Sequence, residues 1–98
     1  MAIGVGVSTY PWAIASIVQN APRQSGVYAI LGEQDCVYVG ASGDIQASLL
    51  AHIKGDNSCI TRNSPIGFQF SLVPSSLRVF QRNQLIIALW PICNLHEE

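Results

Sequence analysis

Apolar and polar residues are arranged along the chain in patterns that predict six elements of secondary structure. Near the N-terminus, apolar residues recur at helical spacing after Pro11, and proline suits the first turn of a helix. Ser8 and Thr9 lie where a side chain can cap the exposed backbone N–H groups at a helix start. We expect this helix to run from Pro11 to about Asn20, because the residue before Pro22 disfavours helical backbone.

Two short runs rich in β-branched and aromatic residues follow, Gly26 to Leu31 and Cys36 to Gly40. The four residues between them, 32–35, are typical of a β-hairpin loop. Both runs are apolar on both faces, whereas a strand covered on one side only would alternate with polar residues. We therefore expect helices to cover both faces of the sheet that contains this hairpin.

A second helix is predicted directly after the hairpin. Asp44 is well placed to cap its start. The segment 55–58 ends the helix, and we expect a polar loop from there through Pro65. The apolar residues of the helix recur every four positions and form one stripe, made by Ile45, Leu49 and Ile53.

A third strand and a third helix complete the predicted fold. Residues 67–73 alternate between apolar and polar side chains, which indicates a half-buried strand. The next helix is expected from about Leu77 to Trp90, where Pro91 stops it. The order is α-β-β-α-β-α. It predicts one α+β domain over residues 1–98, with a small three-stranded antiparallel or mixed sheet flanked by helices.

Composition and charge exclude several classes of protein. Of the 98 residues, 49% are apolar and 11% charged, against about 25% charged in a typical domain. The formal net charge is −1. Intrinsic disorder is excluded by the apolar content, and a strongly basic nucleic-acid tail by the charge. So few charges leave room for an apolar surface that contacts another molecule.

The cysteines and the N-terminal segment bear on the cellular compartment. Cys36, Cys59 and Cys93 form no closely spaced pair, and their odd number argues against a disulfide framework. Cys36 and Cys93 lie in apolar runs that indicate buried thiols, while a zinc site of all three with a histidine stays open. Residues 1–9 lack the basic region of a secretion signal, and the chain has no membrane-spanning run. We expect a cytoplasmic protein that has no contact with membranes.

The hairpin carries a paired motif. Gly26-Val27-Tyr28 is followed, ten residues on, by Tyr38-Val39-Gly40, and this pair resembles the signature of the GIY-YIG endonucleases. The resemblance covers about residues 26–94, preceded by the predicted helix at about 11–20. The further matches lie in the same order as in that family: Ala41 to Ile45, His52, Leu85-Ile86 and the tail Pro91-Ile92-Cys93-Asn94.

The resemblance implies metal-assisted hydrolysis of a phosphodiester. Tyr28 and Tyr38 would lie near the scissile phosphate, one of them positioning or deprotonating the attacking water. The resemblance also implies an arginine on the helix after the hairpin, which stabilises the developing charge, and a glutamate on the last helix, which holds a divalent metal. In this chain the arginine position is Ser48, and the glutamate position is Arg82.

The change at the glutamate position is the more damaging of the two. A hard cation such as magnesium prefers carboxylate oxygen, and Arg82 would repel it. Shifting the register by one residue gives Gln81 or Asn83, and neither is anionic. We therefore interpret the site as a catalytically degenerate nuclease site without metal or cofactor. Its candidate residues are Tyr28, Tyr38, Ser48, His52 and Arg82.

Each candidate residue also has a structural interpretation. Tyr28 and Tyr38 could pack within the sheet, and His52 could be a hydrogen-bonded structural histidine. Arg78 and Arg82 are four residues apart and form a basic edge, which could be solvated or could bind a phosphate or a carboxylate. The residues that we expect to be structural are Gly26 and Gly40, which allow tight chain paths, and Asn94, which ties down the chain after the last helix.

Three hypotheses about function stay open. The first is a non-catalytic module that binds a protein, a second copy of the chain, or nucleic acid weakly. The second is a working endonuclease with a rebuilt site, which alone would need magnesium or manganese. The third is a structural or oligomerising protein that keeps only the scaffold. Strong autonomous DNA binding is not expected, because the basic residues are few and scattered: Arg23, Lys54, Arg62, Arg78 and Arg82.

Overall fold

The chain folds around one antiparallel β-sheet, as the computed structural model, which describes residues 7–94, shows. This confirms the predicted α+β class with helices flanking an antiparallel sheet, although the sheet has four strands where three were expected. The elements follow in the order β1 Tyr10–Pro11, α1 Ile14–Asn20, β2 Gly26–Leu31, β3 Cys36–Ser42, α2 Ile45–Ile53, α3 Ser58–Arg62, β4 Gly67–Leu72 and α4 Arg78–Leu89.

The sheet has the strand order β1-β4-β2-β3, and every neighbouring pair is antiparallel. The predicted hairpin is formed by β2 and β3. Its register places Tyr28 opposite Gly40 and Ile30 opposite Tyr38. Because side chains alternate across a strand, Tyr28 and Tyr38 therefore project from the same face of the sheet.

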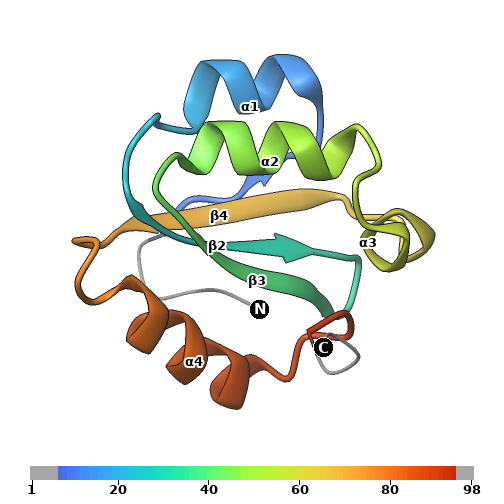
Figure 1. Ribbon diagram of the computed structural model, residues 1–98. Helices are drawn as coiled ribbons and strands as arrows, with labels where there is room; N and C mark the ends of the chain where they lie inside the picture. The colour runs from blue at the N-terminus through green and yellow to red at the C-terminus, as the bar shows by residue number, and fades with distance from the viewer. Residues whose placement is uncertain (1–6, 95–98) are drawn as a thin grey trace.

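Helices cover both faces of the sheet, as the apolar pattern of the hairpin predicted. Helices α1 and α2 lie on one face and α4 lies on the other (Figure 1). Each face has its own buried cluster. The first includes Ile17, Tyr28, Ile30, Leu49 and Phe68, and the second includes Val27, Ala29, Val39 and Leu85.

The N-terminal helix is shorter than predicted, because the residues before it form an edge strand. Strand β1 pairs with β4, where Tyr10 lies opposite Phe68. A proline is tolerated there, since an edge strand does not need every backbone N–H. Helix α1 begins at Ile14 without a side-chain cap, and the Thr9 hydroxyl instead accepts a 2.7 Å hydrogen bond from the Gln69 amide.

Two further expectations in the middle of the chain are wrong. The predicted polar loop before Pro65 contains α3, which forms because the Asn57 side chain accepts hydrogen bonds from the backbone of Cys59 and Ile60. In β4 the burial does not alternate as predicted. Gln69 is buried and its amide donates to the Thr9 hydroxyl, which satisfies the polar group there, whereas Leu72 is exposed at the strand end.

The expectation of unpaired cysteines is wrong for two of the three. Cys59 and Cys93 form a disulfide with a Cα–Cα distance of 5.7 Å, within the ordinary range for such a bond. This also removes the zinc hypothesis, which needed all three cysteines. Helix α3 brings Cys59 to the C-terminal tail, and the spacing of the cysteines could not show this. Cys36 is a buried thiol as predicted, and burial raises its pKa from 9.0 to about 11.

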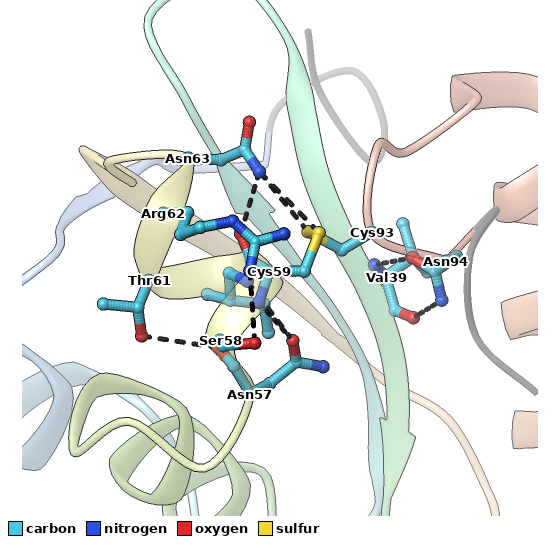
Figure 2. Close-up of a disulfide and its surroundings, with 10 residues drawn as sticks. Val39, Asn57, Ser58, Cys59, Thr61, Arg62, Asn63, Cys93 and Asn94 are labelled. Atoms are coloured by element: carbon cyan, nitrogen blue, oxygen red, sulfur yellow. Dashed lines mark hydrogen bonds between the residues drawn. A yellow bond between two sulfur atoms is a disulfide. The ribbon is translucent and has the colours of Figure 1, made fainter.

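The tail after α4 lies along the free edge of β3. The Ile92 and Cys93 N–H groups donate to Cys36 O and Val37 O at 3.0 and 2.8 Å. The Asn94 side chain then accepts from Val39 N–H at 2.7 Å and donates to Val39 O at 2.8 Å (Figure 2). One amide thus satisfies both backbone groups of an edge residue. Within the described residues, no helix is long and apolar enough to cross a membrane.

Candidate functional site

A chain of hydrogen bonds links Tyr28 on β2 to His52 on α2 and onward to Asp56. The Tyr28 hydroxyl lies 2.7 Å from His52 Nε2, and His52 Nδ1 lies 2.8 Å from Asp56 Oδ1. A neutral His52 that donates its Nδ1–H to the Asp56 carboxylate accepts at Nε2, so the Tyr28 hydroxyl is the donor. Tyr28 is 3% exposed and His52 is 9% exposed, whereas the Asp56 side chain is 48% exposed, so the chain of hydrogen bonds leads from the interior to the surface.

Tyr38 completes the cluster from the neighbouring strand. Its ring meets His52 edge-on with centroids 5.1 Å apart, and lies 6.3 Å from the ring of Tyr28. The structure therefore brings together three of the five sequence-predicted site residues. We call Tyr28, Tyr38, His52 and Asp56 the tyrosine–histidine cluster.

Both glycines of the paired motif lie where a neighbouring atom comes too close to the backbone to leave room for a side chain. A Cβ on Gly40 would overlap the Cζ and hydroxyl of Tyr28, which passes directly over Gly40 from the opposite strand. A Cβ on Gly26 would overlap the backbone oxygen of Ser71 on β4. Gly40 therefore determines where the end of the Tyr28 ring lies, and with it the hydrogen bond to His52.

Ser48 lies outside the cluster, in a group of hydroxyls at the start of α2. Its hydroxyl donates to Ser42 Oγ at 2.7 Å, and Ser42 Oγ accepts from Asp44 N at 3.0 Å. Asp44 caps the helix by accepting from Ala47 N at 3.0 Å, as predicted, and its carboxylate pairs with Arg23 at 3.1 Å. The position where the resemblance implies an arginine thus holds a small neutral side chain.

Arg82 lies apart from the tyrosine–histidine cluster. It is on α4, which packs through Leu85 against the opposite face of the sheet (Figure 1). It donates to the neighbouring Asn83, whose side-chain oxygen accepts from the guanidinium at 3.1 and 3.2 Å. Arg78, one turn earlier, donates from Nη1 to Ser25 Oγ at 3.1 Å. The predicted basic edge, made by Arg78 and Arg82, therefore begins beside Ser25, at the end of the sheet where β2 starts.

The acidic residues that the structure describes do not assemble a site for a divalent cation. Helix α4 contains no Asp or Glu, and among residues 7–94 no three His, Cys, Asp or Glu side chains lie together as metal ligands would. Asp56, the acid of the cluster, is bound to His52. Asp44 is held by Arg23 and the helix cap, and Glu33 and Asp35 lie in the hairpin loop. The side chains of residues 7–94 therefore do not fit the metal that the resemblance implies.

Sequence reasoning missed Asp56 as a member of the cluster. The available signal was its spacing, because an acid four residues after a histidine lies on the same side of a helix. Asp56 lies beyond Ile53, the last residue of α2, and the C-cap Lys54, and its backbone N–H still bonds to Ala51 O at 3.2 Å. This extra turn brings the carboxylate back over His52.

Comparison with known proteins shows the fold. No family model matches the chain, and no curated protein matches it in sequence. Solved structures do match. One is the GIY-YIG N-terminal endonuclease domain of UvrC from Thermotoga maritima bound to magnesium, its catalytic divalent cation, with a TM-score of 0.70 and 17% identity over 81% of this chain and 92% of that one. A point mutant of that domain, bound to its catalytic divalent cation, matches with a TM-score of 0.70 and 17% identity over 81% and 91% of the two chains.

These likenesses establish a GIY-YIG-like fold, as the paired motif predicted. At 17% identity they show the fold alone. What this chain does has to be argued from its own residues.

Proposed function

We propose that this GIY-YIG-like fold serves as a non-catalytic module, in which Tyr28 is kept as a buried residue of the protein interior and Tyr38 packs beside it, partly buried. The observation that carries the proposal is the set of acidic side chains. None lies on α4, Asp56 is hydrogen-bonded to His52, and Asp44 pairs with Arg23. Hydrolysis of a phosphodiester by the chemistry that the resemblance implies needs a cation to neutralise the leaving oxygen, and a carboxylate to hold that cation.

The geometry of Tyr28 supports the same proposal. A tyrosine that positions or deprotonates an attacking water has to present its hydroxyl to that water. Here the Tyr28 hydroxyl is buried and directed at His52 Nε2. Ser48 supplies no positive charge, so the charge that develops on a phosphate would also go without its expected neutralising group on α2.

A cleavage assay tests this proposal. Purified protein is incubated with supercoiled plasmid, branched DNA and single-stranded DNA in the presence of magnesium or manganese. We expect no metal-dependent cleavage above that of the matched Tyr28→Phe variant. Cleavage by the natural protein that Tyr28→Phe abolishes would overturn the proposal and favour a nuclease with a rebuilt site.

The outward face of α4 favours a contact with a second copy of this chain as a further function. Its exposed positions form an uncharged stripe around Asn83, made by Val79, Phe80, Ile87 and Trp90. Large apolar side chains gathered on one exposed helix face mark an interaction surface. A chain with a net charge of −1 meets little like-charge repulsion on self-association. Antiparallel pairing of two such helices would bring the Asn83 amides together at the centre.

The backbone at the end of this stripe supports its use as a contact. Trp90 has the left-handed backbone angles φ 50° and ψ 57°, which a non-glycine residue adopts at a cost of about 1–2 kcal/mol. Its side chain is 72% exposed, so the fold of one chain gains little from a tryptophan there. A second copy that covers Trp90 would supply the missing burial.

Sedimentation velocity over a range of protein concentrations tests the contact. We expect a dimer that Phe80→Glu dissociates and that Ile66→Glu leaves intact, because Ile66 is equally exposed but lies before β4. A protein that remains monomeric up to about 1 mM, or a dimer that both variants weaken equally, would contradict the proposal.

A further inference from the structure

One disulfide fixes the segment that covers the edge of β3. Residues 92–94, which we call the edge strap, lie along this strand, and the bond between Cys59 and Cys93 joins them to α3 (Figure 2). The edge strap satisfies outward-facing backbone groups of β3: the carbonyl of Val37, and both the N–H and the carbonyl of Val39. A strand edge without such cover exposes a row of unpaired backbone groups to solvent.

The edge strap has few other attachments. Within the described part of the chain, its hydrogen bonds to β3 are two from backbone N–H groups and two at the Asn94 side chain. Each adds modest net stability, and ordering the backbone of each strap residue costs about as much. Among residues 92–94, Cys93 alone is buried, while Pro91 is fully buried at the end of α4, so the edge strap can leave without it. The covalent bond therefore decides whether the edge strap stays in place.

The disulfide can be reached from one side. Cys93 is 2% exposed, whereas Cys59 is partly exposed, so a thiolate from solution has access to the Cys59 sulfur. Asn63, one turn after Cys59, and Ile92 line an open pocket of about 330 Å³ beside the hairpin loop, which gives a small thiol room to approach. The Asn63 side-chain amide lies 3.7 Å from Cys59 Sγ and 3.8 Å from Cys93 Sγ and donates toward both (Figure 2). A donor at this place stabilises the negative charge on the sulfur that leaves.

We propose that the disulfide between Cys59 and Cys93 is a redox switch, which holds the edge strap on β3 when oxidised and releases it when a dithiol reduces the bond. A thiolate of the dithiol attacks Cys59 Sγ, the bond between the two cysteine sulfurs breaks, and Cys93 leaves as a thiolate that takes up a proton. The second thiolate of the dithiol then attacks the dithiol sulfur bonded to Cys59. Cys59 leaves and is protonated, and the dithiol is oxidised to a cyclic disulfide.

Two features of the chain favour a switch over a permanent staple. Cys36, which lies on the same edge strand, is a buried thiol, so the three cysteines do not form a disulfide framework. The core also remains when the edge strap leaves. Among the buried members of the two clusters, the strap contributes Cys93 alone, and the other members come from the sheet and the helices. The reduced protein therefore keeps its sheet and loses the cover of one edge.

The rate of reduction without urea tests whether the folded protein reacts. Dithiothreitol is added at increasing concentrations, new thiols are trapped with iodoacetamide, and mass spectrometry identifies them. We expect the rate of disulfide loss to rise in proportion to the dithiothreitol concentration, because the Cys59 sulfur is attacked directly. Cys36 should stay unmodified, which shows that the protein remains folded. A rate that reaches a plateau, or alkylation of all three cysteines together, would mean that the bond opens only on unfolding and would overturn the switch.

Hydrogen exchange followed by NMR tests whether the edge strap leaves. The reporter is the Val39 N–H, which donates to Asn94, and the reference is the Ala29 N–H on the central strand β2. We expect reduction to speed exchange at Val39 at least about tenfold more than at Ala29, and a cyclic disulfide oxidant to restore the first rate. Cys59→Ser should show the fast exchange without reductant, and Cys36→Ala, which keeps the disulfide, should behave as the natural protein does.

Two outcomes of the exchange experiment would overturn the switch. Equal acceleration at Val39 and Ala29 would show that the disulfide stabilises the whole fold and controls no local opening. Unchanged exchange at Val39 after complete reduction would show that the edge strap stays on β3 by its hydrogen bonds alone.

Discussion

The contribution of the tyrosine–histidine cluster to the stability of the fold can be measured by removing the hydrogen bond between Tyr28 and His52. Replacing Tyr28 with Phe removes the hydroxyl and leaves His52 Nε2 buried without this partner. Removing one partner of a buried hydrogen bond costs about 1–3 kcal/mol. A chain of this length unfolds with an entropy of about 0.2 kcal/mol/K near 60 °C, so the expected fall in Tm is about 5–15 °C.

Thermal unfolding followed by circular dichroism measures this change, with Tyr10→Phe as the matched control. The Tyr10 ring stacks on Phe70 with centroids 5.9 Å apart and lies 5.4 Å from the ring of Phe68, so its contacts within residues 7–94 are made by the ring, which the variant keeps. We expect Tyr10→Phe to change the free energy of unfolding by less than about 0.5 kcal/mol. In the double variant Tyr28→Phe/His52→Leu, the loss should be smaller than the sum of the single losses, because both polar groups are gone. Equal melting temperatures for Tyr28→Phe and Tyr10→Phe would refute the reasoning.

Three other predictions concern the tail, the disulfide and the remaining thiol. Reducing the disulfide between Cys59 and Cys93, which are 34 residues apart, should lower the free energy of unfolding in urea by about 4 kcal/mol, and the reductant should have no effect on Cys59→Ser. Asn94→Ala should cost about 1–3 kcal/mol in the same assay, because both backbone groups of Val39 lose their partner, and an unchanged midpoint would contradict this. Because burial raises the pKa of the Cys36 thiol from 9.0 to about 11, the unfolded chain releases that proton first, and stability should fall as the pH rises through this interval. Mass spectrometry after iodoacetamide treatment at pH 8 should find Cys36 unmodified in the folded protein and modified in urea.

The parts of the fold that the sequence predicted are those with strong local patterns. The hairpin was predictable because both of its strands are apolar on both faces, and this also required helices in two layers. Helix α2 was predictable from the Asp44 cap and the stripe that begins at Ile45. Strand β1 was not, because two residues pair only when β4 is already in place, and Pro11 suits a helix start equally well.

The residues of the candidate site were likewise predictable only where a sequence motif located them. The paired motif located Tyr28, Tyr38 and His52, which the hairpin register and α2 bring together. Arg82 was grouped with them by its spacing from the tail, but spacing does not tell which face of the sheet a helix covers. The contact of Arg78 with Ser25 joins residues 53 positions apart, and no local pattern shows such a contact. The disulfide likewise depended on α3, whose five residues are too few for a periodic signal.

Titration with Mn²⁺, followed by NMR line broadening, tests the central claim most directly, because the claim is that these side chains cannot hold a divalent cation. Manganese broadens the signals of nuclei close to its binding site, and it reports binding whether or not any DNA is cleaved. We predict no saturable broadening at Tyr28, Tyr38 or His52 up to millimolar Mn²⁺, and the same result for the Tyr28→Phe variant. Saturable broadening at these residues that excess magnesium reverses would contradict the account, because it would show a metal site beside the hairpin tyrosines.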